Sequence, residues 1–180
     1  MEYQKLLKML KEYNFKKART GGKLALFRQG NLTTNVGYTQ RVLTRANKVV
    51  PSAAMVENKS AIYDECKDLF PDFEFNAVQI NKNFKCPPHV DNKNCGESLI
   101  VGLGDFTGGD LIVGGNKVDI RYKPYIFNGS LIEHSTDDFE GDRYSVVLFN
   151  LKQSCKWKIA IPSYKRALML QVKTLATLER

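Results

Sequence analysis

The apolar positions at the two ends of the chain follow a helical period. Residues 2–13 place leucines on one side and lysines elsewhere, which predicts an amphipathic helix packed on the body of the protein. A second helix is expected over roughly 53–69, because Pro51 precedes it and Pro71 ends it. Residues 163–180 repeat leucine and valine at helical spacing and predict a C-terminal helix.

From residue 73 onward the pattern changes to short apolar runs separated by glycine and asparagine. Gly108-Gly109 and Asn128-Gly129 are among these turn signals. Two strand-like runs also precede this region, at 23–28 and 36–43. The strands expected after residue 73 are 73–81, 97–103, 110–113, 117–122, 125–127, 131–134 and 143–151. Many short strands with tight turns are typical of a sandwich or jelly roll.

The chain of 180 residues has the length of one domain. We predict a mainly β protein with flanking helices (α+β), organised in three parts. Residues 1–72 form a helical and basic N-terminal layer, 73–162 form the jelly-roll core, and 163–180 form the C-terminal helix.

The hydropathy of the chain and the spacing of its cysteines indicate the cellular compartment in which the protein is expected. No apolar run approaches the ~18–20 residues that a membrane span requires, and the N-terminal segment lacks the apolar core of a signal peptide. We therefore expect a cytoplasmic or nuclear protein with no membrane partner. The cysteines show no zinc-binding spacing and are expected as free thiols in a reducing compartment; they are Cys66, Cys86, Cys95 and Cys155.

Charge is distributed unevenly along the chain. Residues 1–50 hold 11 Lys or Arg against two Glu, a net +9, whereas residues 51–180 hold 16 against 17, a net −1. A basic N-terminal third beside a nearly neutral body favours a polyanionic partner, with DNA the obvious candidate. A surface that promotes solubility is the simpler interpretation, and composition alone leaves both open.

The strongest chemical signal is a pair of motifs that carry both histidines of the chain. His89 and Asp91 are two residues apart, so on an extended segment their side chains lie on the same face. His134 follows at the end of a strand-like run. Two histidines and one carboxylate form the facial triad of non-haem Fe(II) oxygenases, which leaves coordination positions for a cosubstrate and O₂.

A second pair of polar residues follows in a segment that becomes continuously apolar. Arg143 and Ser145 are again two residues apart, so a guanidinium and a hydroxyl face the same way. This pair suits a carboxylate held by charge-assisted hydrogen bonds. Beside an Fe(II) site, it indicates 2-oxoglutarate as the cosubstrate. Taken singly, His89 has an ordinary interpretation as a loop residue and Arg143 as a partner of Asp142; the order of the two motifs favours the iron site.

Six segments resemble Fe(II)/2-oxoglutarate dioxygenases, and in particular the ten-eleven-translocation and J-binding-protein group, which oxidises the methyl group of 5-methylcytosine or thymine in DNA. The segments are 75–81, 88–94, 98–106, 108–111, 127–134 and 139–145. The resemblance is close over 73–150 and loose over 1–50. It implies a double-stranded β-helix (jelly roll) core, and Fe²⁺, 2-oxoglutarate and O₂ as cofactors.

Carried over residue by residue, the resemblance makes His89, Asp91 and His134 the catalytic iron ligands. It makes Arg143 and Ser145, with Asn81, the residues that bind 2-oxoglutarate. Asn94 matches a position that contacts the target base, although it is equally interpreted as a loop-capping residue. Arg41 or Arg45 corresponds to an N-terminal arginine that binds cosubstrate or DNA. The cysteine-rich zinc-binding extension of the animal enzymes is missing, which fits a small viral, phage or microbial enzyme.

Three other functions remain open at this point. A protein hydroxylase acting on prolyl or other side chains would use the same iron site, although many prolyl hydroxylases carry Lys where this chain has Arg143. An AlkB-like demethylase would remove N-alkyl groups from nucleic acid. A non-catalytic nucleic-acid-binding barrel would need neither the metal ligands nor the carboxylate clamp.

Overall fold

The computed structural model describes residues 2–15, 32–43, 46–51 and 60–151. Within these residues the elements are α1 (Gln4–Glu12), β1 (Leu32–Leu43), β2 (Ala46–Pro51), α3 (Ser60–Leu69), β3 (Ala77–Lys82), β4 (Ser98–Gly108), β5 (Leu111–Val113), β6 (Asn116–Val118), β7 (Tyr125–Phe127), β8 (His134–Thr136) and β9 (Phe139–Phe149). The predicted strand at 23–28, the predicted C-terminal helix at 163–180, Arg45 and Cys155 lie outside the described residues.

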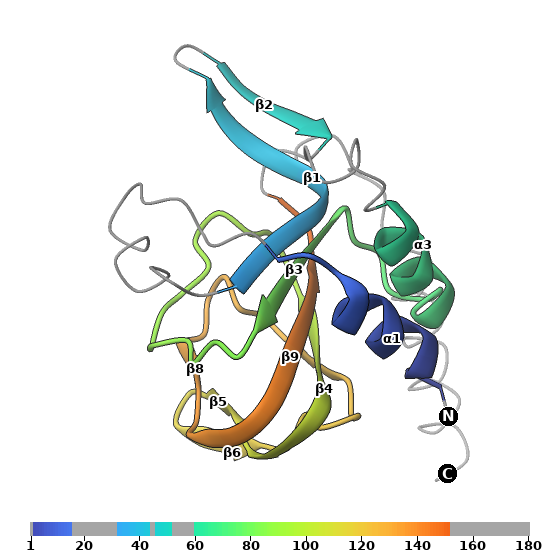
Figure 1. Ribbon diagram of the computed structural model, residues 1–180. Coiled ribbons are helices and arrows are strands. Elements are labelled where there is room, and N and C mark those ends of the chain that lie inside the picture. Colours follow the sequence, from blue (N-terminus) through green and yellow to red (C-terminus); the bar gives the residue numbers. More distant parts are fainter. Residues whose placement is uncertain (1, 16–31, 44–45, 52–59, 152–180) are drawn as a thin grey trace, which may run out of the picture.

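The strands form two antiparallel sheets. The larger sheet has the order β2-β1-β3-β9-β4-β7, and the smaller has the order β6-β5-β8. Figure 1 shows α1 and α3 together beside the larger sheet, with β5, β6 and β8 away from them. The predicted jelly-roll core with N-terminal helices is therefore confirmed. The first half of β1 also pairs with β3, so the N-terminal part of the chain adds a strand to the core sheet.

Strand β9 is the centre of this arrangement, because it pairs with β3 on one side and β4 on the other. Its side chains alternate between two environments, as a strand requires. Val146 and Leu148 enter the hydrophobic core beneath the helices. Arg143 and Ser145 are buried on the opposite face. One face of β9 therefore packs in the hydrophobic core, and the opposite face carries the polar side chains of Arg143 and Ser145.

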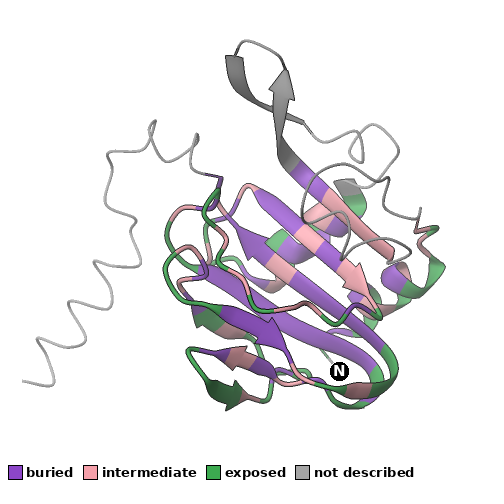
Figure 2. Ribbon diagram, turned by 90° about the vertical axis from the view of Figure 1, so that its left-hand side faces the viewer, coloured by how far each residue is buried: buried purple, intermediate pink, exposed green. Residues whose placement is uncertain are grey.

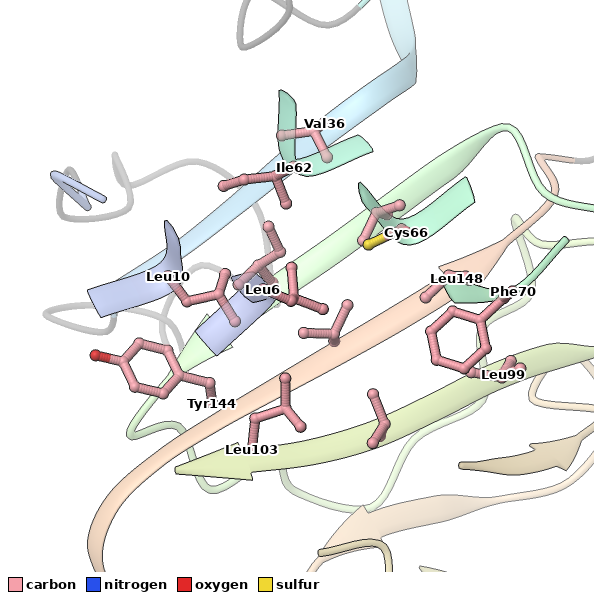
Figure 3. Close-up of a cluster of buried hydrophobic side chains, with 14 of the residues drawn as sticks. Leu6, Leu10, Val36, Ile62, Cys66, Phe70, Leu99, Leu103, Tyr144 and Leu148 are labelled. Carbon is pink, nitrogen blue, oxygen red and sulfur yellow. The ribbon is translucent and has the colours of Figure 1, made fainter. Parts of the chain in front are cut away.

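The hydrophobic core between the two helices and the larger sheet holds the N-terminal helix α1 on the sheet. Leu6 and Leu10 of α1 have no exposed surface, and they pack in the same cluster as Cys66 and Phe70 from the region of α3. Figure 3 shows these side chains together above β9 and β4. Figure 2 shows that the buried residues run along the central strands, whereas exposed residues gather in the connections. The core therefore fixes β9 and the strands beside it.

The segment before His134 differs from the sequence prediction. A strand was expected over 131–134, but the structure has a turn over 129–131 and a bend at 132, and β8 begins at His134. The main-chain N–H groups of Leu131 and Ile132 both donate to the carbonyl oxygen of Asn128, at 3.1 and 3.0 Å. These turn hydrogen bonds take donors that a strand ladder would need. Leu131 and Ile132 are exposed as a result.

Candidate metal centre

The main chain brings the two histidines together. His89 and His134 form an isolated antiparallel β-bridge, in which each N–H donates to the other residue's carbonyl oxygen at 3.0 Å. The N–H of Asp91 donates to the carbonyl oxygen of Gly129 at 2.8 Å. The loop before β4 is therefore tied to the segment that leads into β8. Backbone pairing alone sets the approach of His89, Asp91 and His134.

The three side chains converge on a single point. Nε2 of His89 lies 3.5 Å from Oδ1 of Asp91, and Nε2 of His134 lies 3.7 Å from Oδ2 of the same carboxylate. The imidazole ring centroids are 4.2 Å apart. One ligand atom from each residue lies within 4.8 Å of the other two. This is the one such group of three metal-ligating side chains among the described residues.

Each imidazole has a hydrogen bond that fixes which nitrogen faces the carboxylate. Nδ1 of His89 lies 2.9 Å from the carbonyl oxygen of Pro87, and Nδ1 of His134 lies 3.0 Å from that of Ile132. A carbonyl oxygen only accepts, so Nδ1 carries the hydrogen and the neutral ring presents a lone pair at Nε2. Metal-ligating histidines are oriented in the same manner. Phe127 packs edge-on against His134, with centroids 4.9 Å apart.

The electrostatics of the metal-free site reflect this convergence. The hydrogen bond to Asp91, followed by that to Cys86, raises the pKa of His89 to about 10. Burial raises the pKa of the Asp91 carboxyl, but the hydrogen bonds and charges of the two histidines outweigh it, so the pKa lies well below its ordinary value. The carboxylate is therefore ionised at neutral pH. Two imidazoles and one carboxylate fit a divalent transition metal and leave further coordination positions for other ligands.

The candidate metal centre lines a cavity of about 400 Å³ between the two sheets. Polar side chains from β3 and β9 form one wall, and the loop that carries Asp91 forms another. Among the residues predicted from the sequence, the lining includes Asn81, His89, Asp91, Asn94, His134 and Ser145. The volume lies within the range of ordinary small-molecule sites, roughly 300–1,000 Å³.

Arg143 lies on the same face of β9 as Ser145, but it does not line the cavity and only 1% of its surface is exposed. Its guanidinium lies over the rings of Phe106 and Phe139, at 5.5 and 5.4 Å from the centroids. Nη2 donates to the carbonyl oxygen of Gly109 at 3.1 Å, whereas the buried Nε has no hydrogen-bond partner in the described part of the chain. Burial lowers the pKa of Arg143 to about 10. A desolvated guanidinium with an unused donor fits an anionic group such as a carboxylate.

Asn81 and Ser145 face one another across β3 and β9. Nδ2 of Asn81 donates to Oγ of Ser145 at 3.0 Å, and Nε2 of Gln79 donates to Oδ1 of Asn81, also at 3.0 Å. Gln79 lines the cavity and was not predicted from the sequence. Gln79 could have been predicted from the alternation of side chains along β3, because it lies two residues from Asn81 and shares its face.

Asn94 is buried, and its amide nitrogen donates to Oδ2 of Asp91 at 3.1 Å. The backbone N–H of Asn94 also donates to the carbonyl oxygen of Asp91 at 2.8 Å, so the residue closes the turn that follows Asp91. Its interpretation as a loop-capping residue thus has a direct structural basis. Its predicted contact with a target base remains a prediction.

Arg41 lies in β1, in the part that pairs with β2 beyond the core sheet. The register sets Arg41 opposite Lys48. Figure 1 shows the β1–β2 hairpin projecting from the body of the protein. The other half of β1 reaches the site, because Asn35 lines the cavity.

The cysteines differ from one another in state. Cys66 and Cys86 are free thiols. The prediction of a free thiol is wrong for Cys95, which is disulfide-bonded. Cys86 lines the cavity, with Sγ 3.5 Å from Nδ1 and 3.8 Å from Nε2 of His89. Sequence spacing gave no signal for this contact.

No family model and no curated protein match the sequence. Among solved structures, NgTET1 in complex with 5mC DNA is 15% identical, with a TM-score of 0.49 over 67% of this chain and 61% of that chain. A 2OG-Fe(II) oxygenase family oxidoreductase from Burkholderia pseudomallei is 18% identical, with a TM-score of 0.49 over 81% and 76%. A Pseudomonas putida prolyl-4-hydroxylase is 11% identical, with a TM-score of 0.47 over 82% and 83%.

The chain therefore spans less than two thirds of the NgTET1 chain that it matches. At these identities and TM-scores the likeness assigns no activity. Function is inferred below from the side chains of the cavity and its surroundings. No helix among the described residues combines the length and apolarity needed to cross a membrane.

Proposed function

We propose that this chain is an Fe(II)- and 2-oxoglutarate-dependent dioxygenase that hydroxylates the methyl group of 5-methylcytosine, or of thymine, in DNA. One observation carries the proposal. The Nε2 atoms of His89 and His134 lie beside the carboxylate of Asp91 at the wall of a cavity. The guanidinium of Arg143, which forms no ion pair among the described residues, is buried on the same strand face as cavity-lining Ser145.

His89, Asp91 and His134 would hold the iron. The donor set fits, because both histidines present Nε2 and the carboxylate is ionised. Iron bound there, together with 2-oxoglutarate, would supply the oxidation of an unactivated C–H bond by O₂, with succinate and CO₂ as co-products. The overall reaction balances: one oxygen atom enters the new carboxylate of succinate and the other enters the hydroxyl group of the product.

Arg143, Ser145 and Asn81 would bind the cosubstrate. The Arg143 guanidinium has a free donor at Nε, and the Ser145 hydroxyl lines the cavity beside Asn81. A carboxylate that reaches the guanidinium from the side of Ser145 would neutralise a buried charge that has no ion-pair partner among the described residues. Charge-assisted hydrogen bonds between a guanidinium and a carboxylate are roughly twice as strong as neutral ones. The charged cosubstrate would thus be oriented with its other end toward the metal centre.

Three features support DNA as the substrate. The first 50 residues carry a net charge of +9. The β1–β2 hairpin carries Arg41 and Lys48 at paired register positions, which adds basic residues to a part of the chain outside the core sheet. Arg45, which follows Arg41 closely in the sequence, would add a further phosphate contact. A base in duplex DNA would have to leave the stack to reach a recessed site, and Asn94 would contact it there.

The test is an incubation of the protein with Fe(II), 2-oxoglutarate and duplex DNA that contains 5-methylcytosine, followed by mass spectrometry of nucleosides. We expect 5-hydroxymethylcytosine from the wild type and none from His134→Ala. Folding of the variant is checked by circular dichroism. Oxidation of thymine would retain the DNA assignment. Succinate formation with a peptide or with N-alkylated DNA, and none with 5-methylpyrimidines, would replace it with a protein hydroxylase or a demethylase.

A further inference from the structure

Asn94 is held in place by contacts that do not involve the side chain of Asp91. It is 7% exposed, and it forms an isolated β-bridge with Leu151, which packs in a small buried cluster with Ala77 and Phe149. Its backbone N–H closes the turn onto the carbonyl oxygen of Asp91 at 2.8 Å. The amide group therefore extends from a fixed position in the fold.

The backbone of Asp91 is held by the hydrogen bond from its N–H to the carbonyl oxygen of Gly129, but its side chain lacks such support. Its side chain is 33% exposed in a turn, and the carboxylate is free to rotate unless neighbouring groups hold it. The nearest His89 nitrogen faces Oδ1, whereas the nearest His134 nitrogen faces Oδ2. The Asn94 amide donates to Oδ2 at 3.1 Å. Apart from the two histidines, Asn94 is the neighbour whose side chain holds this carboxylate among the described residues.

We infer that Asn94 is a positioning residue for the metal centre, which acts through Asp91. Its amide N–H fixes the plane of the carboxylate and occupies a lone pair of Oδ2. An oxygen engaged in this way is a poorer second ligand, so Asp91 binds the metal through a single oxygen. Coordination positions then remain open for other ligands. This inference rests on the proposed metal site, but it is independent of the substrate.

The two roles of Asn94 predict different results in the absence of substrate. A residue that only contacts the target base leaves metal binding unchanged when it is truncated. A residue that orients a metal ligand changes metal affinity by 10–100-fold, which is the usual effect of losing such a hydrogen bond. Metal affinity of the substrate-free protein therefore separates the two roles.

The experiment titrates the metal-free protein of 180 residues with Co²⁺. Calorimetry and the cobalt absorption spectrum both give the dissociation constant. We expect Asn94→Ala to weaken Co²⁺ binding by 10–100-fold. Asn92→Ala is the matched control, because Asn92 is the same residue type in the same turn but is exposed. It should bind Co²⁺ as the wild type does.

Asn94→Ser is a second variant that separates the loss of the hydrogen bond from a folding defect. Serine is a good turn residue, but its hydroxyl is shorter than the asparagine amide. This variant should also weaken Co²⁺ binding, while thermal unfolding of the metal-free protein stays close to wild type. In an Asp91→Ala background, Asn94→Ala should have no further effect on affinity, because the group that it positions is gone.

Wild-type Co²⁺ affinity in both Asn94 variants would overturn the inference and leave the proposed function intact. If the Asn94 variants bind Co²⁺ more weakly but the wild type does not turn over 2-oxoglutarate, the inference about Asn94 stands and the proposed function is refuted. In that case Asn94 would position a metal ligand in a protein with another function.

Discussion

Replacing Arg143 by methionine should separate the stability of this protein from its capacity to bind 2-oxoglutarate. Truncating a large buried side chain ordinarily costs about 2–5 kcal/mol. Arg143 differs because its guanidinium is 1% exposed and no residue in the described part of the chain forms an ion pair with it. Methionine has a similar length, no charge and enough flexibility to fill the space between Phe106 and Phe139.

The expected change in the free energy of unfolding for Arg143→Met starts from the cost of burying the guanidinium charge. Burial lowers the pKa of Arg143 from 12.5 to about 10, so it disfavours the charged guanidinium on the order of 3 kcal/mol. Methionine removes that cost. It also loses the hydrogen bond to Gly109 and the contacts with two aromatic rings, each worth about 1 kcal/mol. These contributions nearly cancel, so the variant without cosubstrate should unfold within a few degrees of the wild type.

Binding of 2-oxoglutarate should distinguish the two proteins. At a hundred times its dissociation constant a ligand stabilises the folded state by about 2.7 kcal/mol. For a domain of this size that corresponds to roughly 5–10 °C in Tm. The assay is thermal unfolding with Mn²⁺ in place of iron, with and without 2-oxoglutarate. The wild type should show the shift, and Arg143→Met should not.

Arg121→Met is the matched control for this experiment. The Arg121 guanidinium also lies 5.5 Å from the centroid of the Phe106 ring, but its side chain is 44% exposed. The control should keep the full shift in Tm. If 2-oxoglutarate stabilises Arg143→Met as much as the wild type, the carboxylate is bound elsewhere. If the variant without cosubstrate loses more than 10 °C, the buried charge was compensated after all.

Two further predictions follow from the surroundings of the site. Gly109 has φ of +72°, and a Cβ atom there would lie 2.8 Å from Nε of Arg143, so Gly109→Ala should displace the guanidinium and abolish the 2-oxoglutarate shift in Tm. Gly115→Ala has similar strain (φ +84°) but no atom within 4 Å, so it should lose about 1–2 kcal/mol of stability and keep the shift; equal effects would refute the steric argument. Burial raises the pKa of Cys66 to about 12, whereas Cys86 lines the cavity, so iodoacetamide at pH 8 should label Cys86 and spare Cys66 in the folded protein. Peptide mass spectrometry measures this, and labelling of Cys66 at the rate of Cys86 would contradict the described packing.

The polar residues of the cavity could be predicted from local spacing because strands alternate. His89 with Asp91, and Arg143 with Ser145, lie two residues apart, and each pair occupies one face in the structure. The alternation of β9 also separates these side chains from the apolar residues that pack beneath the helices. Local periodicity was therefore sufficient for the fold class and for placing each of these two pairs on one face.

Contacts between segments that are distant in the sequence could not be predicted from local periodicity. The stacking of Arg143 on Phe106 and Phe139 depends on how β4 and β9 pair, and no local pattern records it. The approach of Cys86 to His89 depends on the course of a loop. The turn before His134 was missed because its apolar residues, Leu131 and Ile132, are exposed rather than buried.

The central claim is that a reaction at the metal centre couples the oxidation of 2-oxoglutarate to hydroxylation of a 5-methylpyrimidine in DNA. The most direct measurement supplies dioxygen labelled with the heavy oxygen isotope, together with Fe(II), 2-oxoglutarate and duplex DNA that contains 5-methylcytosine. Mass spectrometry of both products should find one labelled oxygen atom in succinate and one in the hydroxymethyl group, with the two products in equal amounts. Succinate no more abundant than in the His134→Ala control, or a hydroxymethyl group without label, would contradict the claim.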